Sequence, residues 1–277
     1  MTDATRQEYA TRAAIERMWS HAVGIANRAL AAHGWDPSSG MYGREDSAPG
    51  TGVAVRWGEH CCILTAKHVL EGAQVSDLQF FARPSGSFIY ASEIKPKDVL
   101  AGVSLNDPSA VMHRCEREDL ALISLRDTGA LGPYLEFADL KNSCVDPGEG
   151  DVVIGLGFPV ANAAMFGRRI GSRIEKAVAL APTGFSGAVM APGVGRYFQR
   201  FDSERHYLIP YELASQGKHP KGISGAAVWL QSKESAPVWS PRFSFAGVCT
   251  DCYKEGTIEQ IVKASVATAF LADVFGS

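Results

Sequence analysis

The first hydrophobic pattern in the chain has the spacing of an α-helix. Within a stretch rich in Ala, Arg and Glu, apolar residues recur at Ile15, Met18, Trp19, Ala22, Val23, Ala26 and Leu30. Apolar side chains at this spacing line one face of a helix. His33 and Gly34 can end that helix, and residues 35–52, rich in Pro, Ser and Gly, are typical of a loop. The sequence therefore predicts an amphipathic helix over residues 5–32, followed by a linker.

Beyond Gly52 the pattern changes to short apolar runs separated by clusters of Gly, Pro, Asp and Asn. Such runs are typical of β-strands. The clearest are residues 53–57, 61–65, 78–82, 88–91, 121–125, 152–156, 207–210, 226–230 and 245–250. Helical spacing returns at Ile258, Ile261, Val262, Val266, Phe270, Leu271 and Val274, which predicts a C-terminal helix over residues 257–275. Many short strands closed by one helix favour an all-β barrel or sandwich over a doubly wound α/β sheet.

Composition narrows the class of protein. The chain has 277 residues, of which 46% are apolar, so it can bury a large core. Its net charge of -3 and its scattered Lys and Arg residues predict no nucleic-acid partner. No apolar run reaches the length of a signal peptide or a membrane span, so we expect a cytoplasmic protein with no membrane partner.

The cysteines add no site of their own to this picture. There are six of them, and a chain of this size without an export signal needs no disulfide staples, so we expect mostly thiols. Cys249 and Cys252 have the CxxC spacing of redox and metal sites, but a zinc site would need a second ligand pair, and adjacent Cys61 and Cys62 form a poor one. We therefore predict no metal and no cofactor.

Three residues in separate blocks could together perform acyl transfer by a serine. That chemistry needs an imidazole to accept the hydroxyl proton, a carboxylate to fix the imidazole tautomer, and backbone N–H groups to hold the oxyanion. His68 lies just past the end of a predicted strand, and Asp119 opens the buried run DLALISL. Ser224 lies in GISGAAVW, a glycine-flanked turn that leads into another strand. We therefore predict His68 as general base, Asp119 as its orienting carboxylate and Ser224 as nucleophile.

The sequence motifs around these residues resemble those of a known protein family. GTGVAV with LTAKHV, DLALI and GISGAAV match, in order, the blocks that carry the His, Asp and Ser of the trypsin-like (chymotrypsin-fold) serine proteases. GDVVIGLGFP resembles the strand that opens their second barrel. The chain is most similar to bacterial members with minimal loops. Any one block is a weak signal, but four in the family's order are specific.

The resemblance implies two packed six-stranded antiparallel β-barrels with the active site between them. We place the N-terminal helix and linker at residues 1–50 and the protease domain at 51–277, with the first barrel at about 51–135 and the second at about 136–255. The resemblance also implies an oxyanion hole formed by the N–H groups of Gly222 and Ser224. A glycine at 222 suits a turn that points two amides at one spot.

Two features depart from the family or compete with the assignment. Vertebrate members have an aspartate before the serine, which pairs with a newly cut N-terminus, whereas this chain has Ile223. We therefore expect no activation by that salt bridge. Ser186, in GFSG, is a second candidate nucleophile, but it follows Asp119 too closely for enough strands of the second barrel to precede it.

The substrate pocket is less well defined by the sequence. By resemblance, the residues just upstream of Ser224 and the strand around residues 248–252 should line it, which singles out Lys218, His219, Thr250 and Asp251. An inward-pointing Lys218 would favour an acidic or polar substrate side chain, and Asp251 would favour the opposite. Lys218 on a solvated surface loop is an equal alternative.

Two classes of function fit these residues. The first is a serine endopeptidase with a protein or peptide substrate; the second is a catalytically silent barrel of the same fold that acts as a binding or interaction module. An α/β-hydrolase is disfavoured, because neither serine motif completes GxSxG and no histidine follows Ser224. Because a cytosolic protease must be restrained, we expect residues 5–32, or a regulatory partner that binds them, to control access to the cleft.

Overall fold

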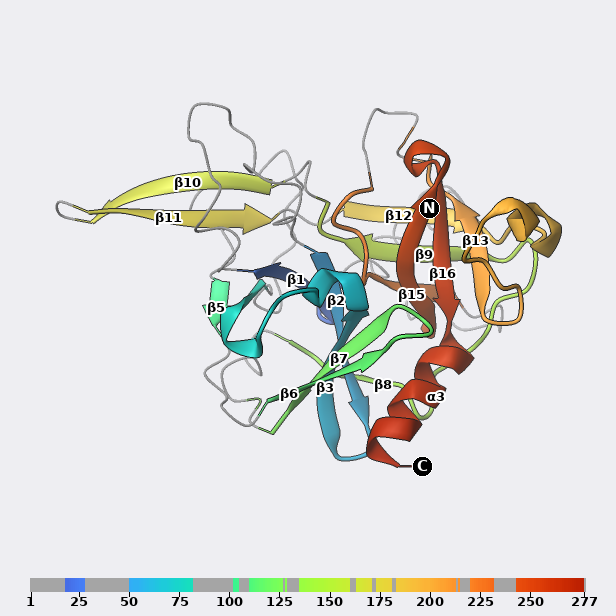
Figure 1. Ribbon diagram of the computed structural model, residues 1–277, viewed down its shortest axis with the longest axis horizontal. Coiled ribbons are helices and arrows are strands. Elements are labelled where there is room, and N and C mark those ends of the chain that lie inside the picture. The colour runs from blue at the N-terminus through green and yellow to red at the C-terminus, as the bar shows by residue number, and fades with distance from the viewer. Residues whose placement is uncertain are drawn as a thin grey trace, which may run out of the picture.

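A computed structural model gives the structure of the protein (Figure 1). It describes residues 18–27, 50–81, 102–104, 110–126, 128, 135–159, 163–170, 173–180, 183–212, 214, 220–231 and 243–276. Within these ranges the chain forms two large sheets, one separate hairpin and one C-terminal helix. None of the helices in the described ranges is long and apolar enough to span a bilayer.

The first sheet is built from the N-terminal half of the chain. Its strands are β1 (Ala22–Asn27), β2 (Gly50–Trp57), β3 (His60–Ala66), β4 (Leu78–Phe81), β5 (Gly102–Ser104), β6 (Val111–Cys115), β7 (Leu120–Leu125) and β8 (Ala138–Asp139). They follow the order β5-β4-β1-β2-β3-β7-β6, and β8 pairs with β2 in parallel. Two short 3-10 helices, η2 (Lys67–Leu70) and η3 (Val75–Asp77), join β3 to β4. This sheet therefore brings the end of β3 beside the start of β7.

The second sheet comes from the C-terminal half. It contains β9 (Val152–Gly157), β12 (Thr183–Ala188), β13 (His206–Pro210), β14 (Ala227–Gln231), β15 (Phe243–Tyr253) and β16 (Ile258–Lys263), in the order β12-β9-β14-β15-β16-β13. Strands β10 (Ala163–Ile170) and β11 (Arg173–Leu180) form a hairpin that projects from the body (Figure 1). Two more 3-10 helices are η7 (Pro192–Tyr197) and η9 (Lys254–Gly256), and the chain ends in α3 (Ala264–Phe275).

The two sheets and α3 share one hydrophobic core. Val53 and Leu120 enter it from the first sheet, Trp229 and Phe245 from the second, and Leu271 from α3. Each sheet also has a cluster of its own, one around Phe80 and Ile123 and one around Ile209 and Val228. The all-β architecture with a C-terminal helix agrees with the prediction, although the first sheet has eight strands in the described residues where six were expected.

The predicted N-terminal helix is wrong over Ala22–Asn27. This segment forms β1, which pairs with β2 on one side and with β4 on the other. Val23 and Ile25 are buried, so two β-branched residues at alternate positions face the core. Hydrogen bonding along both edges outweighs the helical spacing of the apolar residues. Met18 and Trp19 are helical and residues 20 and 21 form a turn; the rest of the predicted helix lies outside the described residues, as does the predicted strand at 88–91.

The C-terminal helix begins later than predicted. Ile258–Lys263 form strand β16, and the helix starts at Ala264. β16 pairs with β15 and β13, and all its residues except Lys263 are buried, including Glu259 and Gln260. A strand covered on both faces loses the alternation that would identify it, so its apolar residues matched helical spacing by coincidence. The second sheet accordingly extends past the predicted limit at residue 255.

Candidate active site

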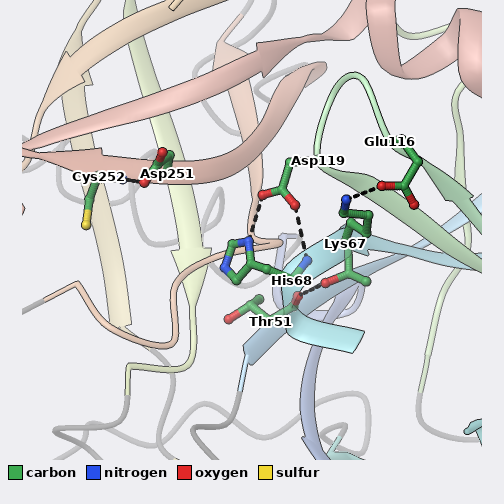
Figure 2. Close-up of polar contacts among 8 residues, drawn as sticks. Thr51, Lys67, His68, Glu116, Asp119, Asp251 and Cys252 are labelled. Atoms are coloured by element: carbon green, nitrogen blue, oxygen red, sulfur yellow. Dashed lines mark hydrogen bonds and ion pairs between the residues drawn. The ribbon is translucent and has the colours of Figure 1, made fainter. Parts of the chain in front are cut away.

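His68 and Asp119 meet at one edge of the first sheet. His68 lies in η2 directly after β3, and Asp119 directly precedes β7. The two strands are antiparallel neighbours, with Ala66 opposite Leu120, so the residue beyond one and the residue before the other fall together. The His68 Nδ1 atom lies 2.7 Å from Asp119 Oδ2 (Figure 2).

Asp119 is held in position from two sides by the turn that carries His68. The Lys67 amide donates to the Asp119 carbonyl at 2.7 Å, and the His68 amide donates to Asp119 Oδ1 at 3.1 Å. Asp119 itself has a φ of 52°, in the left-handed region that Asp tolerates better than most residues. Both carboxylate oxygens are therefore engaged by His68, one by its amide and one by its ring.

This geometry selects a tautomer of His68. A carboxylate accepts hydrogen bonds only, so Nδ1 carries the proton and Nε2 of the neutral ring carries the free lone pair. The side chain is 43% exposed, which leaves its far edge open to solvent and to a ligand. His68 is thus arranged to accept a proton at Nε2.

The pKa of His68 is raised above its ordinary value. Partial burial of the ring would lower the pKa, but the hydrogen bond to Asp119 and the negative charges of Asp119, Asp251 and Glu71 outweigh that effect. The neutral base therefore forms at a higher pH than it would in an isolated histidine.

The turn that carries Ser224 is fastened to β2 through Thr51. The Thr51 amide donates to the Ser224 carbonyl at 2.9 Å, and the Thr51 hydroxyl donates to the Gly222 carbonyl at 2.7 Å. The same hydroxyl accepts from the Phe158 amide at 2.9 Å. Thr51 belongs to the GTG motif, but nothing local in the sequence assigned it this role, because its partners lie more than a hundred residues away.

Gly225 allows that turn to lie against β2. It has a φ of 89°, and a Cβ there would run into the Thr51 carbonyl oxygen and the Thr65 hydroxyl. Its amide donates to the Cys249 carbonyl at 2.7 Å. The glycine after the predicted nucleophile is therefore required both by its backbone conformation and by the close approach of the neighbouring strand.

The two parts of the site are connected, but no hydrogen bond joins the predicted nucleophile Ser224 to the predicted base His68 in the described part of the chain. The Thr65 hydroxyl donates to the Thr51 carbonyl at 2.6 Å, which links the Ser224 turn through β2 to the strand that leads to His68. Between these two described residues there is no hydrogen bond from the Ser224 hydroxyl to His68. In ligand-free enzymes this contact is often long. The structure therefore shows a hydrogen bond between His68 and Asp119 but none between His68 and Ser224.

The two amides predicted to form the oxyanion hole differ from the neighbouring amides in their hydrogen bonding. Ile223 donates to Pro220, and Ala226 donates to Ile223, each at 2.8 Å. Within the described part of the chain, the amides of Gly222 and Ser224 have no acceptor. Gly222 has a φ of 96°, as a turn of this kind requires. The two N–H groups on either side of Ile223 thus have no internal hydrogen-bond partner among these residues.

A cleft of about 500 Å³ lies beside His68 and Asp119. The second sheet contributes Thr250 and Asp251 to its wall, so these two predicted pocket residues share a cavity with the predicted base. Ser224 does not line this cavity. Lys218 and His219, the other predicted pocket residues, lie outside the described residues.

The competing serine and the CxxC pair take no part in this arrangement. Ser186 lies inside β12, opposite Ile154 of β9, and not in a turn. The Cys249 thiol is buried and donates to Glu259 Oε2 at 3.0 Å, and burial raises the pKa of both Cys249 and Cys252, the latter to about 11. These groups are therefore protonated thiols, and the described residues contain no cluster of three potential metal ligands.

Comparison with known proteins identifies the fold. No family model and no curated protein sequence matches the chain. Among solved structures, the scabies mite inactivated protease paralogue S-D1 is similar with a TM-score of 0.53 and 12% identity, over 95% of this chain and 94% of that one. Human heparin binding protein gives 0.54 and 10% over 95% and 94%, and the VesB protease of Vibrio cholerae gives 0.50 and 12% over 93% and 64%. The chain therefore has the trypsin-like (chymotrypsin) fold of the serine proteases.

Proposed function

We propose that the chain is a serine endopeptidase that acts on proteins or peptides through an acyl-enzyme. The observation that carries the proposal is the His68–Asp119 pair, with 2.7 Å between Nδ1 and Oδ2, which leaves Nε2 of the neutral ring free to accept a proton. The Ser224 turn, hydrogen-bonded to β2 next to the strand that leads to His68, supports it. The similarity to solved proteases supports the fold on which such a site is built.

The proposed reaction proceeds in two halves. The Ser224 hydroxyl adds to the scissile carbonyl carbon while its proton passes to His68 Nε2, and the carbonyl oxygen becomes an oxyanion held by the amides of Gly222 and Ser224. The C–N bond then breaks, and His68 returns the proton to the departing amine. Water, deprotonated by His68, repeats these steps on the ester and releases the acid and Ser224. Asp119 keeps the imidazolium oriented and stabilised throughout.

The proposal is tested by covalent labelling with a fluorophosphonate probe. We expect the wild type to be labelled, Ser224→Ala to be unlabelled, and the matched control Ser186→Ala to be labelled like the wild type. His68→Ala should lower kcat on a peptide substrate by several orders of magnitude. Retained labelling of Ser224→Ala would reject Ser224 as the nucleophile.

A second candidate function is a binding module with this fold and no catalysis. It is favoured by the open contact between Ser224 and His68 and by the position of Ser224 outside the cleft. One protein of similar structure is itself described as an inactivated protease paralogue. Absence of labelling in the wild type and in both serine variants would select this alternative.

Regulation through the N-terminal segment remains part of the proposal. A partner that binds residues 5–32, or the segment itself, would limit access of substrate to the cleft. Strand β1 restricts where this segment can act, because residues 22–27 are paired in the first sheet. The regulatory part is therefore assigned to the residues before β1.

A further inference from the structure

A buried carboxylate lies directly beside Asp119. Glu118 precedes it in the turn between β6 and β7, and the Glu118 side chain is 2% exposed. A buried carboxylate is costly unless cations face it. Two guanidinium groups and one imidazole lie close to it: the guanidinium of Arg205, which forms an ion pair with it, Arg117 Nε at 3.3 Å, and His206 Nε2 at 3.6 Å.

Two of these partners come from the start of β13 in the second sheet. His206 is the first residue of β13, and Arg205 immediately precedes it. Arg117 lies on the same turn as Glu118 and is largely exposed. The ion pair between Glu118 and Arg205 therefore links the turn before β7 to the segment that leads into β13, and Glu118 and His206 line the cleft beside His68.

His206 contributes a neutral N–H group to this cluster. Burial lowers the pKa of His206 to about 4, and the positive charges of Arg205 and Lys263 act in the same direction against Asp202. Its Nδ1 accepts a hydrogen bond from the Asp202 amide at 3.1 Å, so the ring proton is on Nε2, the atom that faces Glu118. The negative charge of Glu118 is thus balanced by the guanidinium groups of Arg117 and Arg205. Arg117 lies in the same turn as Glu118, and Arg205 lies outside that turn.

The turn between β6 and β7 is constrained at both ends. On one side, Lys67 and His68 hold the backbone and carboxylate of Asp119. On the other, Glu118 is tied to the second sheet. Between them, Asp119 has a left-handed backbone, a conformation that persists only where its surroundings impose it. Release of Glu118 would allow that residue to relax and its carboxylate to turn away from the imidazole.

We infer, as an extension of the proposed function, that Glu118 and Arg205 are positioning residues. Their ion pair across the two sheets holds the turn in which Asp119 orients His68. The pair makes the alignment of the predicted base depend on the packing of one sheet against the other. Neither residue touches the reacting atoms.

The test compares Glu118→Gln with the control Glu149→Gln. Glu149 is an exposed glutamate in the loop before β9, and it does not line the cleft. The first readout is NMR of the His68 ring, which needs no catalysis. We expect Glu118→Gln to lose the hydrogen-bonded Nδ1 proton signal and to lower the pKa of His68, because the bond to Asp119 raises it. The charges of Asp251 and Glu71 remain, so part of the elevation persists.

The second readout is the kinetics of peptide cleavage. A small displacement of a catalytic group can reduce the rate by about 10²-fold, so we expect kcat to fall on that scale in Glu118→Gln with little change in KM. Glu149→Gln should match the wild type in both parameters. A Glu118→Gln protein with normal NMR signals and normal kcat would overturn the inference.

A double variant that lacks the charges of both Glu118 and Arg205 serves as a second test in case Glu118→Gln does not fold. Replacing a buried ion pair by apolar residues of similar volume is often neutral for stability, so Glu118→Met with Arg205→Met should fold and still show the altered His68 signals. Wild-type His68 signals in that folded double variant would also overturn the inference. A wild type that shows the expected NMR signals but cleaves no peptide would reject the proposed function and leave the positioning intact.

Discussion

At the residue scale, Asp119 is the group on which the geometry of His68 depends. It fixes the proton on Nδ1 through the 2.7 Å contact and supplies the largest favourable effect on the pKa of the ring. An amide in its place could present an N–H to the ring and favour the wrong tautomer. We therefore expect Asp119→Asn to lower kcat by about 10⁴-fold while far-UV circular dichroism stays unchanged. Asp273→Asn, an exposed change on α3, is the control, and equal activity of the two variants would contradict the prediction.

The pH dependence of activity should respond to Asp251. A general base acts in its neutral form, so kcat/KM should rise with pH through the pKa of His68. The charge of Asp251 raises that pKa, and its removal in Asp251→Asn should lower the pKa and move the rising limb to lower pH. Glu149→Gln, a change outside the cleft, should leave the limb in place. The measurement is kcat/KM against pH, and a shift to higher pH would show that the sign is wrong.

The residues of the site differ in how far the sequence could reveal them. His68, Asp119 and Ser224 lie in short sequence motifs that predict their roles, and the structure brings His68 and Asp119 into contact. The roles of Thr51 and Glu118 depend on partners such as Gly222 and Arg205, which are distant in the chain. Contacts of that kind leave no local pattern, so only the folded arrangement exposes them.

At the scale of elements, strands were predicted well where their pattern was local. The runs now seen as β2, β3, β7 and β9 were short, apolar and bounded by turn residues. β1 and β16 were assigned to helices, because apolar residues three and four apart also occur by chance in strands that are covered on both sides. Pairing with two neighbouring strands decides those cases, and that pairing is a property of the sheet.

The packing of the turn that carries Ser224 can be tested by substituting Gly225. Gly225→Ala combines an unfavourable positive φ with a collision against Thr51 and Thr65, so we expect at least about 2 kcal/mol of lost stability. Gly58→Ala is the matched control, because Gly58 also has a positive φ but open space around it. It should cost about 1 kcal/mol. Denaturant titration of both variants measures the difference, and equal losses would exclude the packing argument.

At the scale of the whole molecule, α3 stabilises both sheets at once. Leu271 is fully buried in the core that the two sheets share, and the Trp57 indole donates to the Gly276 carbonyl at 2.9 Å. Leu271→Ala should cost about 2–5 kcal/mol and leave a single unfolding transition, because the core shared by the two sheets is larger than the cluster of either sheet. The exposed Ser265→Ala should change stability by less than about 0.5 kcal/mol. Two separate transitions, followed by fluorescence and circular dichroism, would contradict a shared core.

The N-terminal segment can be divided by the position of β1. Removing residues 1–27 deletes a strand paired on both sides, whose Val23 and Ile25 are buried, so we expect loss of folding. Removing residues 1–17 leaves β1 in place. If the segment before β1 restrains the cleft, this shorter deletion should raise the rate of peptide cleavage at unchanged thermal stability. An unchanged rate would remove the segment from the regulatory proposal.

The six cysteines of the fold are all unpaired thiols, and the most deeply buried of them, Cys62 and Cys249, have pKa values raised by burial. Among the described residues, the association of the two sheets therefore rests on packing, hydrogen bonds and ion pairs, with no covalent bond that an oxidant must make or a reductant could break. We therefore expect a reductant to leave the fold in place, and refolding from urea to need no step of thiol–disulfide exchange.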